Sequence, residues 1–150
     1  EGGWVADVLK EPVSFVDVPP SATQSARNAG EASVVSTLVD ALQKRGLDLR
    51  DVAVLTPFRA QLRELKRVVP ADVELSTIDR FQGKDAACVL VSFARADASS
   101  GLLADPRRLN VALSRARRML ILVGAREALA SASPLFSRLV GAVPVVVASS

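Results

Sequence analysis

The sequence predicts an α/β domain whose parallel sheet is covered by helices on both faces. Short apolar runs of strand length alternate along the chain with segments of helical spacing, which is the order found in parallel sheets. The apolar residues of these runs are consecutive, as they are in strands buried on both faces. The chain has 150 residues, enough for one domain with a sizeable core, so a single domain over 1–150 is expected.

The expected strands are runs rich in Val, Leu, Ile and Ala, bounded by turn residues. Pro19 and Pro20 end the first run, and Pro57 follows the second. The run from Ala87 to Phe93 shows no polar alternation and is predicted to be a central strand. In chain order the expected strands cover residues 13–18, 52–55, 73–77, 87–93, 119–123 and 143–147.

The expected helices lie between these strands and carry an apolar residue every three or four positions. The longest covers about residues 32–45, and Gly46 predicts its end. Asn28 with Glu31 three residues later resembles a capping box at its start. The other expected helices cover residues 62–69 and 105–115 and two segments that begin near residues 126 and 134.

Composition excludes several classes of function. Histidine is absent and Cys88 is the single cysteine, so zinc sites of the usual kind, disulfides and nucleophiles paired with histidine are excluded, and no metal site is expected. Apolar runs of about five residues are far too short to span a membrane. The net charge of +3 permits a nucleic-acid partner without requiring one. The chain begins at Glu1, which suggests a piece of a larger protein.

A cluster of arginines without an intervening acid precedes and enters one expected strand. Because an α-helix has about 3.6 residues per turn, Arg108 and Arg115 are expected to project from nearly the same helical face, roughly 10 Å apart. Arginine binds phosphate with a planar fork, so this face predicts an anion site. The alternative is a basic face paired with acids elsewhere in the fold. The cluster comprises Arg107, Arg108, Arg115, Arg117 and Arg118, the last two being expected as solvated charges at the strand's edge.

Three segments are similar to motifs IV, V and VI of superfamily 1B helicases, the group typified by the nonsense-mediated-decay helicase. In the family's order and spacing they are VAVLTPFRAQ, STIDRFQGKDAACVLVSFAR and DPRRLNVALSRARRMLILVG. With NAGEASVVSTLVDALQKRG before them, the resemblance covers residues from about 28 to 140. Asp85 after FQGK is most similar to the eukaryotic replication helicase–nucleases that trim Okazaki-fragment flaps, whereas other members more often carry glutamate there.

The resemblance implies a motor in which two RecA-like domains enclose ATP. The first domain of such helicases carries the phosphate loop and the acids that bind Mg²⁺. This chain has no G-x-x-x-x-G-K-[ST] segment and no Asp-Glu pair at a strand end, so it resembles the second RecA-like domain alone. The implied function is half of an ATP-dependent DNA helicase active in replication and repair, in the nucleus. The isolated chain is expected not to hydrolyse ATP, because ATP and Mg²⁺ would be held mainly by the first domain.

The resemblance also assigns roles to single residues near the nucleotide. Arg115 matches the arginine finger of motif VI, and Arg108 matches a supporting arginine. Gln82, Gly83 and Asp85 match motif V positions near the phosphates and the ribose. Two alternatives remain open: Arg108 forms a salt bridge within the domain, and Asp85 is a simple turn acid.

One segment departs from the family pattern. The family's N-R-x-E-A stands here as Asn28-Ala29-Gly30-Glu31-Ala32, so an alanine replaces a second arginine that contacts phosphate. Glu31 is assigned to the nucleotide site by this match. The alternative is that Asn28 and Glu31 only cap the helix. Arg27, two residues before Ala29, is a candidate substitute for the missing arginine.

The resemblance places single-stranded nucleic acid across the top of both domains. Thr56, Pro57 and Arg59 of motif IV, with Ser92 and Arg95 at the strand end after motif V, are the expected contacts. Hydroxyl and arginine side chains suit phosphates, and the aromatic content of 4% offers little stacking surface, so binding is expected to ignore base sequence.

Two other functions compete with a DNA helicase. The same motor half could belong to an RNA helicase of the nonsense-mediated-decay type, because discrimination of the 2′-hydroxyl rests on a local contact that the sequence does not reveal. A degenerate RecA-like domain that serves as a protein-binding module is the second alternative. Arg115 argues against the degenerate module, and the alanine at position 29 argues for it.

Overall fold

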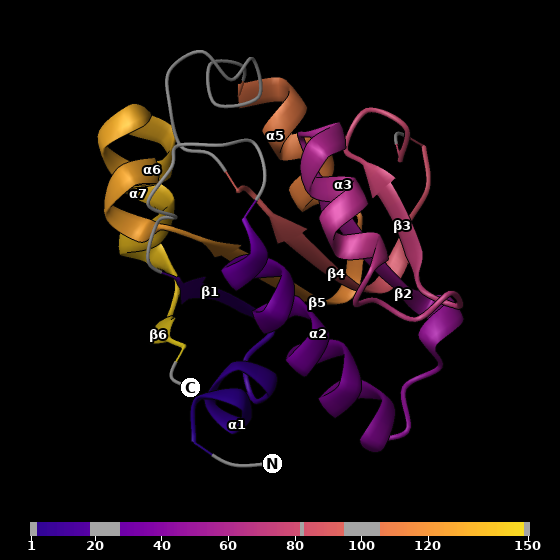
Figure 1. The fold of residues 1–150 in the computed structure, drawn as a ribbon. Helices are drawn as coiled ribbons and strands as arrows, with labels where there is room; N and C mark the ends of the chain where they lie inside the picture. The colour runs from indigo at the N-terminus through magenta and orange to yellow at the C-terminus, as the bar shows by residue number, and fades with distance from the viewer. Residues whose placement is uncertain (1–2, 19–27, 82, 95–105, 149–150) are drawn as a thin grey trace.

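The computed structural model describes residues 3–18, 28–81, 83–94 and 106–148, and it shows a parallel sheet of six strands (Figure 1). In chain order the elements are α1 (Trp4–Leu9), β1 (Val13–Asp17), α2 (Ala29–Lys44), a 3-10 turn (Leu49–Asp51), β2 (Val52–Thr56), α3 (Arg59–Lys66), β3 (Glu74–Thr77), β4 (Ala86–Ser92), α5 (Pro106–Leu113), β5 (Ala116–Gly124), α6 (Arg126–Ala132), α7 (Pro134–Ala142) and β6 (Val145–Val147). The strand order is β3-β2-β4-β5-β1-β6, and every described pair is parallel, which confirms the predicted fold class.

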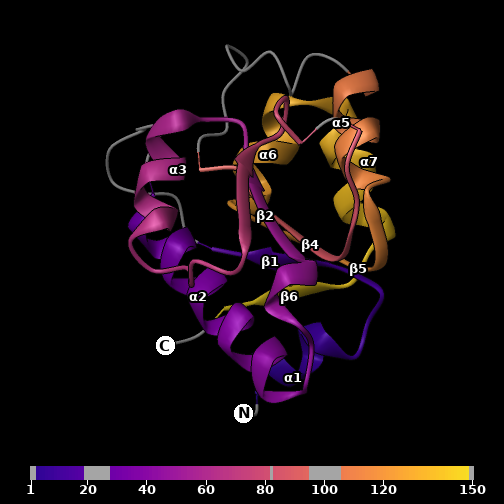
Figure 2. The same cartoon turned by 90° about the vertical axis from the view of Figure 1, so that its right-hand side faces the viewer.

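Two hydrophobic clusters lie on opposite faces of the sheet, because successive side chains of a strand point to opposite sides. On β4, Leu90 belongs to one cluster, and Val89 and Val91 belong to the other. Helices α1, α2 and α3 pack on the first cluster, and α6 and α7 pack on the second. Figure 2 shows α2 and α3 on one side of the sheet and α6 and α7 on the other. Within the described part of the chain, no helix has the length and apolarity needed to cross a membrane.

The central position predicted for residues 87–93 is confirmed. Strand β4 lies between β2 and β5, and all seven of its residues are buried. Each strand neighbour supplies a parallel ladder, so the backbone groups of β4 are paired on both sides. A continuous apolar run is the pattern required at such a position, since both faces of the strand are covered.

The ends of α2 follow the sequence signals. The Asn28 side chain caps the helix, with Oδ1 accepting a hydrogen bond from the Glu31 backbone N–H at 3.0 Å. Gly46 adopts a φ of +92° after the last turn, where the Leu47 N–H donates to the Leu42 carbonyl at 3.1 Å. The capping box is only half formed, because the Glu31 carboxylate does not bind the Asn28 N–H. That N–H donates to Oε1 of Gln61 instead, at 2.6 Å.

Helices α1 and α5 are among the elements that differ from the sequence prediction. Helix α1 was not expected, because six residues are too few to establish a helical period. Helix α5 ends at Leu113, so Arg115 lies in the turn before β5, and the expectation that it shares a helical face with Arg108 is wrong. The reason is sheet pairing: the carbonyl of Arg115 accepts a hydrogen bond from the Ala86 N–H at 3.1 Å, which joins Arg115 to the start of the ladder between β4 and β5.

Parallel pairing gives the sheet two chemically different edges. The carboxyl edge is where the strands end, at Thr77, Thr56 and Ser92 in the neighbouring strands β3, β2 and β4. The amino edge is where the strands begin. Since β4 has seven residues, the two edges lie roughly 20 Å apart along it.

Candidate nucleotide and nucleic-acid sites

A groove with a volume of about 580 Å³ lies at the carboxyl edge, where β2 and β3 end side by side. The start of α3 forms one wall, and the residues that follow β3 form the other. Its lining contains three arginines and one aspartate, so the net charge of the lining is positive. A positive groove suits the phosphate backbone of a nucleic acid. The lining residues are Pro57, Arg59, Leu62, Arg63, Thr77, Asp79 and Arg80. Below, this feature is called the groove.

The groove contains two of the residues expected from the sequence and two arginines that were not. Pro57 and Arg59 line it, as expected for motif IV. Arg63 follows Arg59 by one helical turn, so the helical spacing of α3 would have indicated it. Arg80 follows β3, and only the pairing of β2 with β3 brings it to the same groove.

Thr56 and Ser92, also expected to contact nucleic acid, do not reach the surface. Both residues are 0% exposed. The Ser92 hydroxyl donates to Glu31 Oε1, and the Thr56 hydroxyl oxygen accepts from the Phe58 N–H at 3.4 Å. Neither side chain can therefore contact a nucleic acid directly, because packed elements still cover the ends of β2 and β4 where Thr56 and Ser92 lie. Arg95 lies outside the described residues.

Glu31 is the centre of a buried polar network beside the groove. Its side chain is 1% exposed. Oε1 accepts hydrogen bonds from the Ser92 hydroxyl at 2.8 Å and from the Ala94 backbone N–H at 2.9 Å. Oε2 accepts a longer one from Asn28 Nδ2 at 3.4 Å. Ala94 holds a φ of +59°, a conformation that residues other than glycine rarely adopt.

Gln61 extends this network to α3. Its Nε2 donates to the Ser92 hydroxyl oxygen and to the Asn28 carbonyl, each at 3.0 Å, and its Oε1 accepts from the Asn28 N–H. Gln61 is 0% exposed, and both N–H groups and the oxygen of its amide have hydrogen-bond partners. The start of α2, the middle of α3 and the end of β4 are therefore joined by side-chain hydrogen bonds.

Burial dominates the electrostatics of Glu31. It raises the pKa of this carboxyl to about 7, against the opposing effect of the Ala94 N–H, the Ser92 hydroxyl and the Phe93 N–H. A carboxyl with this pKa changes its charge near neutral pH. The family resemblance assigned Glu31 to the nucleotide site. In the structure its hydrogen bonds to Ser92 and Ala94 place it at the carboxyl edge of the sheet.

The amino edge holds a second polar cluster. Arg117 at the start of β5 pairs with Asp85 through Nη1 and with both carboxylate oxygens of Asp51 through Nη2, at 2.6 Å. The Ala87 N–H and Arg117 lower the pKa of Asp51, and the two aspartates raise the pKa of Arg117. Arg117 is therefore exposed at the start of β5, as expected, but it is ion-paired within the domain and is not a free solvated charge. A contact between Asp85 and a nucleotide would have to compete with this pair.

Gly83 precedes this cluster and shows why a glycine stands in motif V. Its φ is +87°, which strains any residue with a Cβ. A Cβ built there would meet no atom of the chain within 4 Å, so the surrounding space is open. The next residue, Lys84, pairs with Glu74 at 2.8 Å. Gln82 lies outside the described residues.

Arg115 differs from its neighbours in the arginine cluster. It is half-buried, and its Nε is buried without a hydrogen-bond partner. Of the other members, Arg117 is paired with two acids, Arg107 also interacts within the chain, and Arg118 is exposed. The backbone of Arg108 lies on α5, but its side chain is outside the described part of the chain.

The residues assigned to the nucleotide are thus not all gathered at one place. Gly83, Asp85 and the backbone of Arg115 lie at the amino edge, whereas Glu31 lies at the carboxyl edge, roughly 20 Å away along β4. Across the described residues, no group of three or more His, Cys, Asp or Glu side chains could hold a metal ion.

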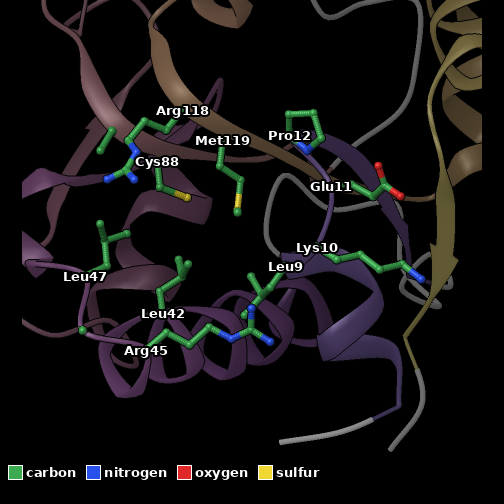
Figure 3. Close-up of a pocket in the computed structure, with 12 residues that line it drawn as sticks. Leu9, Lys10, Glu11, Pro12, Leu42, Arg45, Leu47, Cys88, Arg118 and Met119 are labelled. Atoms are coloured by element: carbon green, nitrogen blue, oxygen red, sulfur yellow. The ribbon is translucent and has the colours of Figure 1, made fainter.

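A second cavity, of about 520 Å³, opens at the amino edge between the ends of α1 and α2. Figure 3 shows Cys88 and Met119 extending from the sheet toward Leu9 and Leu42. Burial raises the pKa of the Cys88 thiol to about 12, so this cysteine stays protonated and is not a nucleophile at neutral pH. Arg118 lies at the same cavity.

Comparison with known proteins agrees with the motifs. At 36% identity over 140 residues the chain is similar to the DNA replication ATP-dependent helicase/nuclease JHS1 of Arabidopsis thaliana, covering 84% of this chain and 10% of that protein. At 38% over 147 residues it is similar to the DNA replication ATP-dependent helicase/nuclease DNA2 of Mus musculus, covering 88% and 14%. At 35% over 117 residues it is similar to the DNA polymerase alpha-associated DNA helicase A of Schizosaccharomyces pombe, covering 75% and 18%. The chain therefore spans less than a fifth of the length of these relatives.

A solved structure and a family model complete the comparison. The fold matches the crystal structure of the C-terminal domain of a possible DNA helicase from Lactobacillus plantarum, with a TM-score of 0.58 and 20% identity, over 96% of this chain and 94% of that one. This likeness supports the fold. The family model described as AAA domain matches residues 4–127, most of the chain. The chain therefore belongs to the AAA domain family, in the form similar to that of the DNA replication helicase–nucleases.

Proposed function

We propose that this chain is the second motor domain of an ATP-dependent DNA helicase, and that it supplies Arg115 to the γ-phosphate of ATP held mainly by a first RecA-like domain. One observation carries the proposal: the Nε of Arg115 is buried and has no hydrogen-bond partner within the described residues. In folded proteins about nine-tenths or more of the buried polar groups are hydrogen-bonded. Arg115 is half-buried and forms no ion pair with an acid in the described part of the chain, so its guanidinium is left to balance an anion from outside the chain.

The neighbouring arginines make Arg115 the best candidate in the cluster. Arg117 already pairs with Asp51 and Asp85, so binding a phosphate would require it to give up two carboxylates. Arg118 is exposed at a cavity on the amino edge. The match of Arg115 to the motif VI finger supports the same choice.

The chemistry of the available residues fits ATP. When bound, ATP supplies the phosphoryl group whose transfer to water releases the energy for movement. The guanidinium of Arg115 would stabilise the negative charge that develops on that group, an effect worth about 10³ to 10⁵ in rate. Gly83 offers an open backbone position for a nucleotide, and Asp85 would reach the ribose only by leaving Arg117.

The groove is proposed to hold the backbone of the single strand. Arg59, Arg63 and Arg80 line it and would contact phosphates, while Thr77 offers a hydroxyl. DNA is favoured over RNA because the similar proteins are named as DNA helicases. The replication names of two of them support a role in DNA replication, with repair and a nuclear location as the corresponding proposals for this protein.

Chemical rescue in the intact protein tests the proposed role of Arg115. Arg115→Ala is expected to bind ATP nearly as wild type does, but to hydrolyse it very slowly. Added guanidinium ion, far below the concentrations that unfold proteins, should restore part of the rate. Arg118→Ala is the matched control and should keep its rate with or without guanidinium. Rapid hydrolysis by Arg115→Ala without added guanidinium would contradict the proposed role of Arg115.

A further inference from the structure

A hydrogen-bond relay connects the buried Glu31 to the helix that carries two arginines of the groove. Glu31 Oε1 accepts from the Ser92 hydroxyl at 2.8 Å, and the same hydroxyl oxygen accepts from Gln61 Nε2 at 3.0 Å. Gln61 lies on α3, two residues after Arg59 and two before Arg63. Its side chain is 0% exposed, whereas both arginines are exposed. The inner side of α3 is thus bonded to the relay while the outer side forms the groove.

We propose that Glu31 is a positioning residue for the single-strand groove, fixing α3 against the end of β4 so that Arg59 and Arg63 line one groove with Arg80. This inference rests on the proposed function of the groove. Glu31 does not touch the strand or the nucleotide in this account. It acts through Ser92 and Gln61.

The acceptor character of the carboxylate gives the relay its direction. Ionised or not, Glu31 presents Oε1 as an acceptor, so the single hydroxyl proton of Ser92 is directed at residue 31. The lone pairs of that hydroxyl then face Gln61, which must present its NH₂ group to them. The Asn28 backbone requires the same orientation, because its N–H can only donate to Gln61 Oε1 and its carbonyl can only accept from Gln61 Nε2. Without an acceptor at position 31, the buried Ser92 hydroxyl proton loses its partner, and the hydrogen bonds that join Gln61 on α3 to the end of β4 are weakened.

The same oxygen holds the chain where it leaves β4. The Ala94 N–H donates to Glu31 Oε1 at 2.9 Å, and Ala94 has a φ of +59°. A non-glycine residue in this region is strained and persists only where neighbouring contacts hold it. If Oε1 is removed, the part-buried Ala94 N–H loses its partner, and the strained conformation of Ala94 loses a contact that stabilises it.

The test measures how single-stranded DNA stimulates ATP hydrolysis by the intact protein. Glu31→Met keeps the length of the side chain and removes the acceptor, and Glu31→Gln keeps an acceptor oxygen but removes the charge. Glu31→Met is expected to raise the DNA concentration for half-maximal stimulation about fivefold or more, equivalent to about 1 kcal/mol. The maximal rate and the ATP KM should stay within about twofold of wild type. Glu31→Gln should resemble wild type in all three quantities.

Several outcomes would overturn the proposal. Wild-type half-saturation in Glu31→Met would show that the relay does not position the groove. A fall in maximal rate with unchanged half-saturation would move Glu31 back to the nucleotide, as the sequence match suggested. Loss in Glu31→Gln equal to that in Glu31→Met would show that charge, and not the acceptor, matters.

A second variant keeps the proposal testable if Glu31→Met does not fold. Ser92→Ala removes the relay hydroxyl with a small change in volume and should raise half-saturation about two- to threefold, in the same direction. An unchanged value would overturn the proposal. Failure of the proposed function is a separate result: in that case wild-type protein would show no stimulation by DNA, or Arg59→Ala and Arg63→Ala would not change half-saturation.

Discussion

Glu31 and Ser92 stand 61 positions apart in the sequence, yet a 2.8 Å hydrogen bond joins their buried side chains at the carboxyl edge of the sheet. Glu31 lies in the first turn of α2, and Ser92 ends the central strand β4. The bond therefore connects the start of α2 to the point where the chain leaves β4. The resemblance had assigned Glu31 to the nucleotide and Ser92 to nucleic acid, whereas in the structure the two side chains bind each other.

The buried carboxyl predicts an unusual dependence of stability on pH. Folding raises the pKa of Glu31 from 4.5 to about 7, so the folded state favours the protonated form. The protonated carboxyl contributes fully to the free energy of unfolding below pH 4.5. This contribution is lost as pH rises from 4.5 through 7, and the loss is on the order of 3 kcal/mol at most. Glu31→Gln cannot ionise and should lack this loss. Urea unfolding of both proteins at pH 5 and pH 8 measures the difference.

Glu127→Gln is the control for that experiment, because Glu127 is exposed on the first turn of α6. Its unfolding midpoints should run parallel to those of wild type at both pH values. Identical pH dependence in Glu31→Gln and wild type would mean that Glu31 is not desolvated in the folded protein.

Salt titration of single-strand binding tests the groove. Arg59→Ala, Arg63→Ala and Arg80→Ala should each reduce the log–log slope of affinity against salt by up to about one, because each removes one phosphate contact. None should change the preference between poly-dT and a mixed sequence, since phosphate contacts carry no base information. Arg138→Ala, on the exposed side of α7, should keep the parental slope. Parental slopes in all three groove variants would place the strand elsewhere.

Arg117 provides a prediction that separates structural from catalytic arginines. Its guanidinium is bonded to Asp51 and Asp85, so Arg117→Ala should leave the maximal rate of ATP hydrolysis within about twofold of wild type. A small fall in thermal stability is expected, because the two aspartates lose their partner. If hydrolysis instead fell as far as in Arg115→Ala, Arg117 would be a phosphate ligand that leaves its ion pairs when ATP binds.

Cys88 reports on the integrity of the sheet. It is 1% exposed, and its pKa of about 12 leaves about a thousandfold less thiolate at pH 8 than an ordinary cysteine has. A thiol reagent should therefore modify the folded chain very slowly and the urea-unfolded chain rapidly. Fast labelling of the folded chain would show that the structure around Cys88, at the beginning of β4, opens readily.

Local signals made much of the fold predictable. The apolar run of β4 required burial on both faces, and Gly46 and Asn28 fixed the two ends of α2 through backbone conformation and capping. Each of these signals acts within a few residues. Helix α1 and the early start of β5 were missed, since six residues are too short for a period and Arg117 and Arg118 hide the first part of the strand.

The site was less predictable because its contacts join distant segments. Gln61 looks like a surface residue of an amphipathic helix, yet its partners Asn28 and Ser92 lie 33 and 31 positions away. Arg80 reaches the groove only because β3 pairs with β2. Similarity to a family supplied Arg115 and Arg59, but it could not separate buried hydroxyls, such as that of Ser92, from exposed ones.

The rate of ATP hydrolysis by Arg115→Ala in the intact protein, at saturating ATP and single-stranded DNA, tests the central claim most directly. The buried, unpartnered Nε of Arg115 leads us to expect a rate lower than wild type by about 10³ to 10⁵, with ATP affinity nearly unchanged. Arg118→Ala, measured beside it, should keep its rate. A rate for Arg115→Ala within about tenfold of wild type would contradict the account, because an arginine finger contributes far more than that.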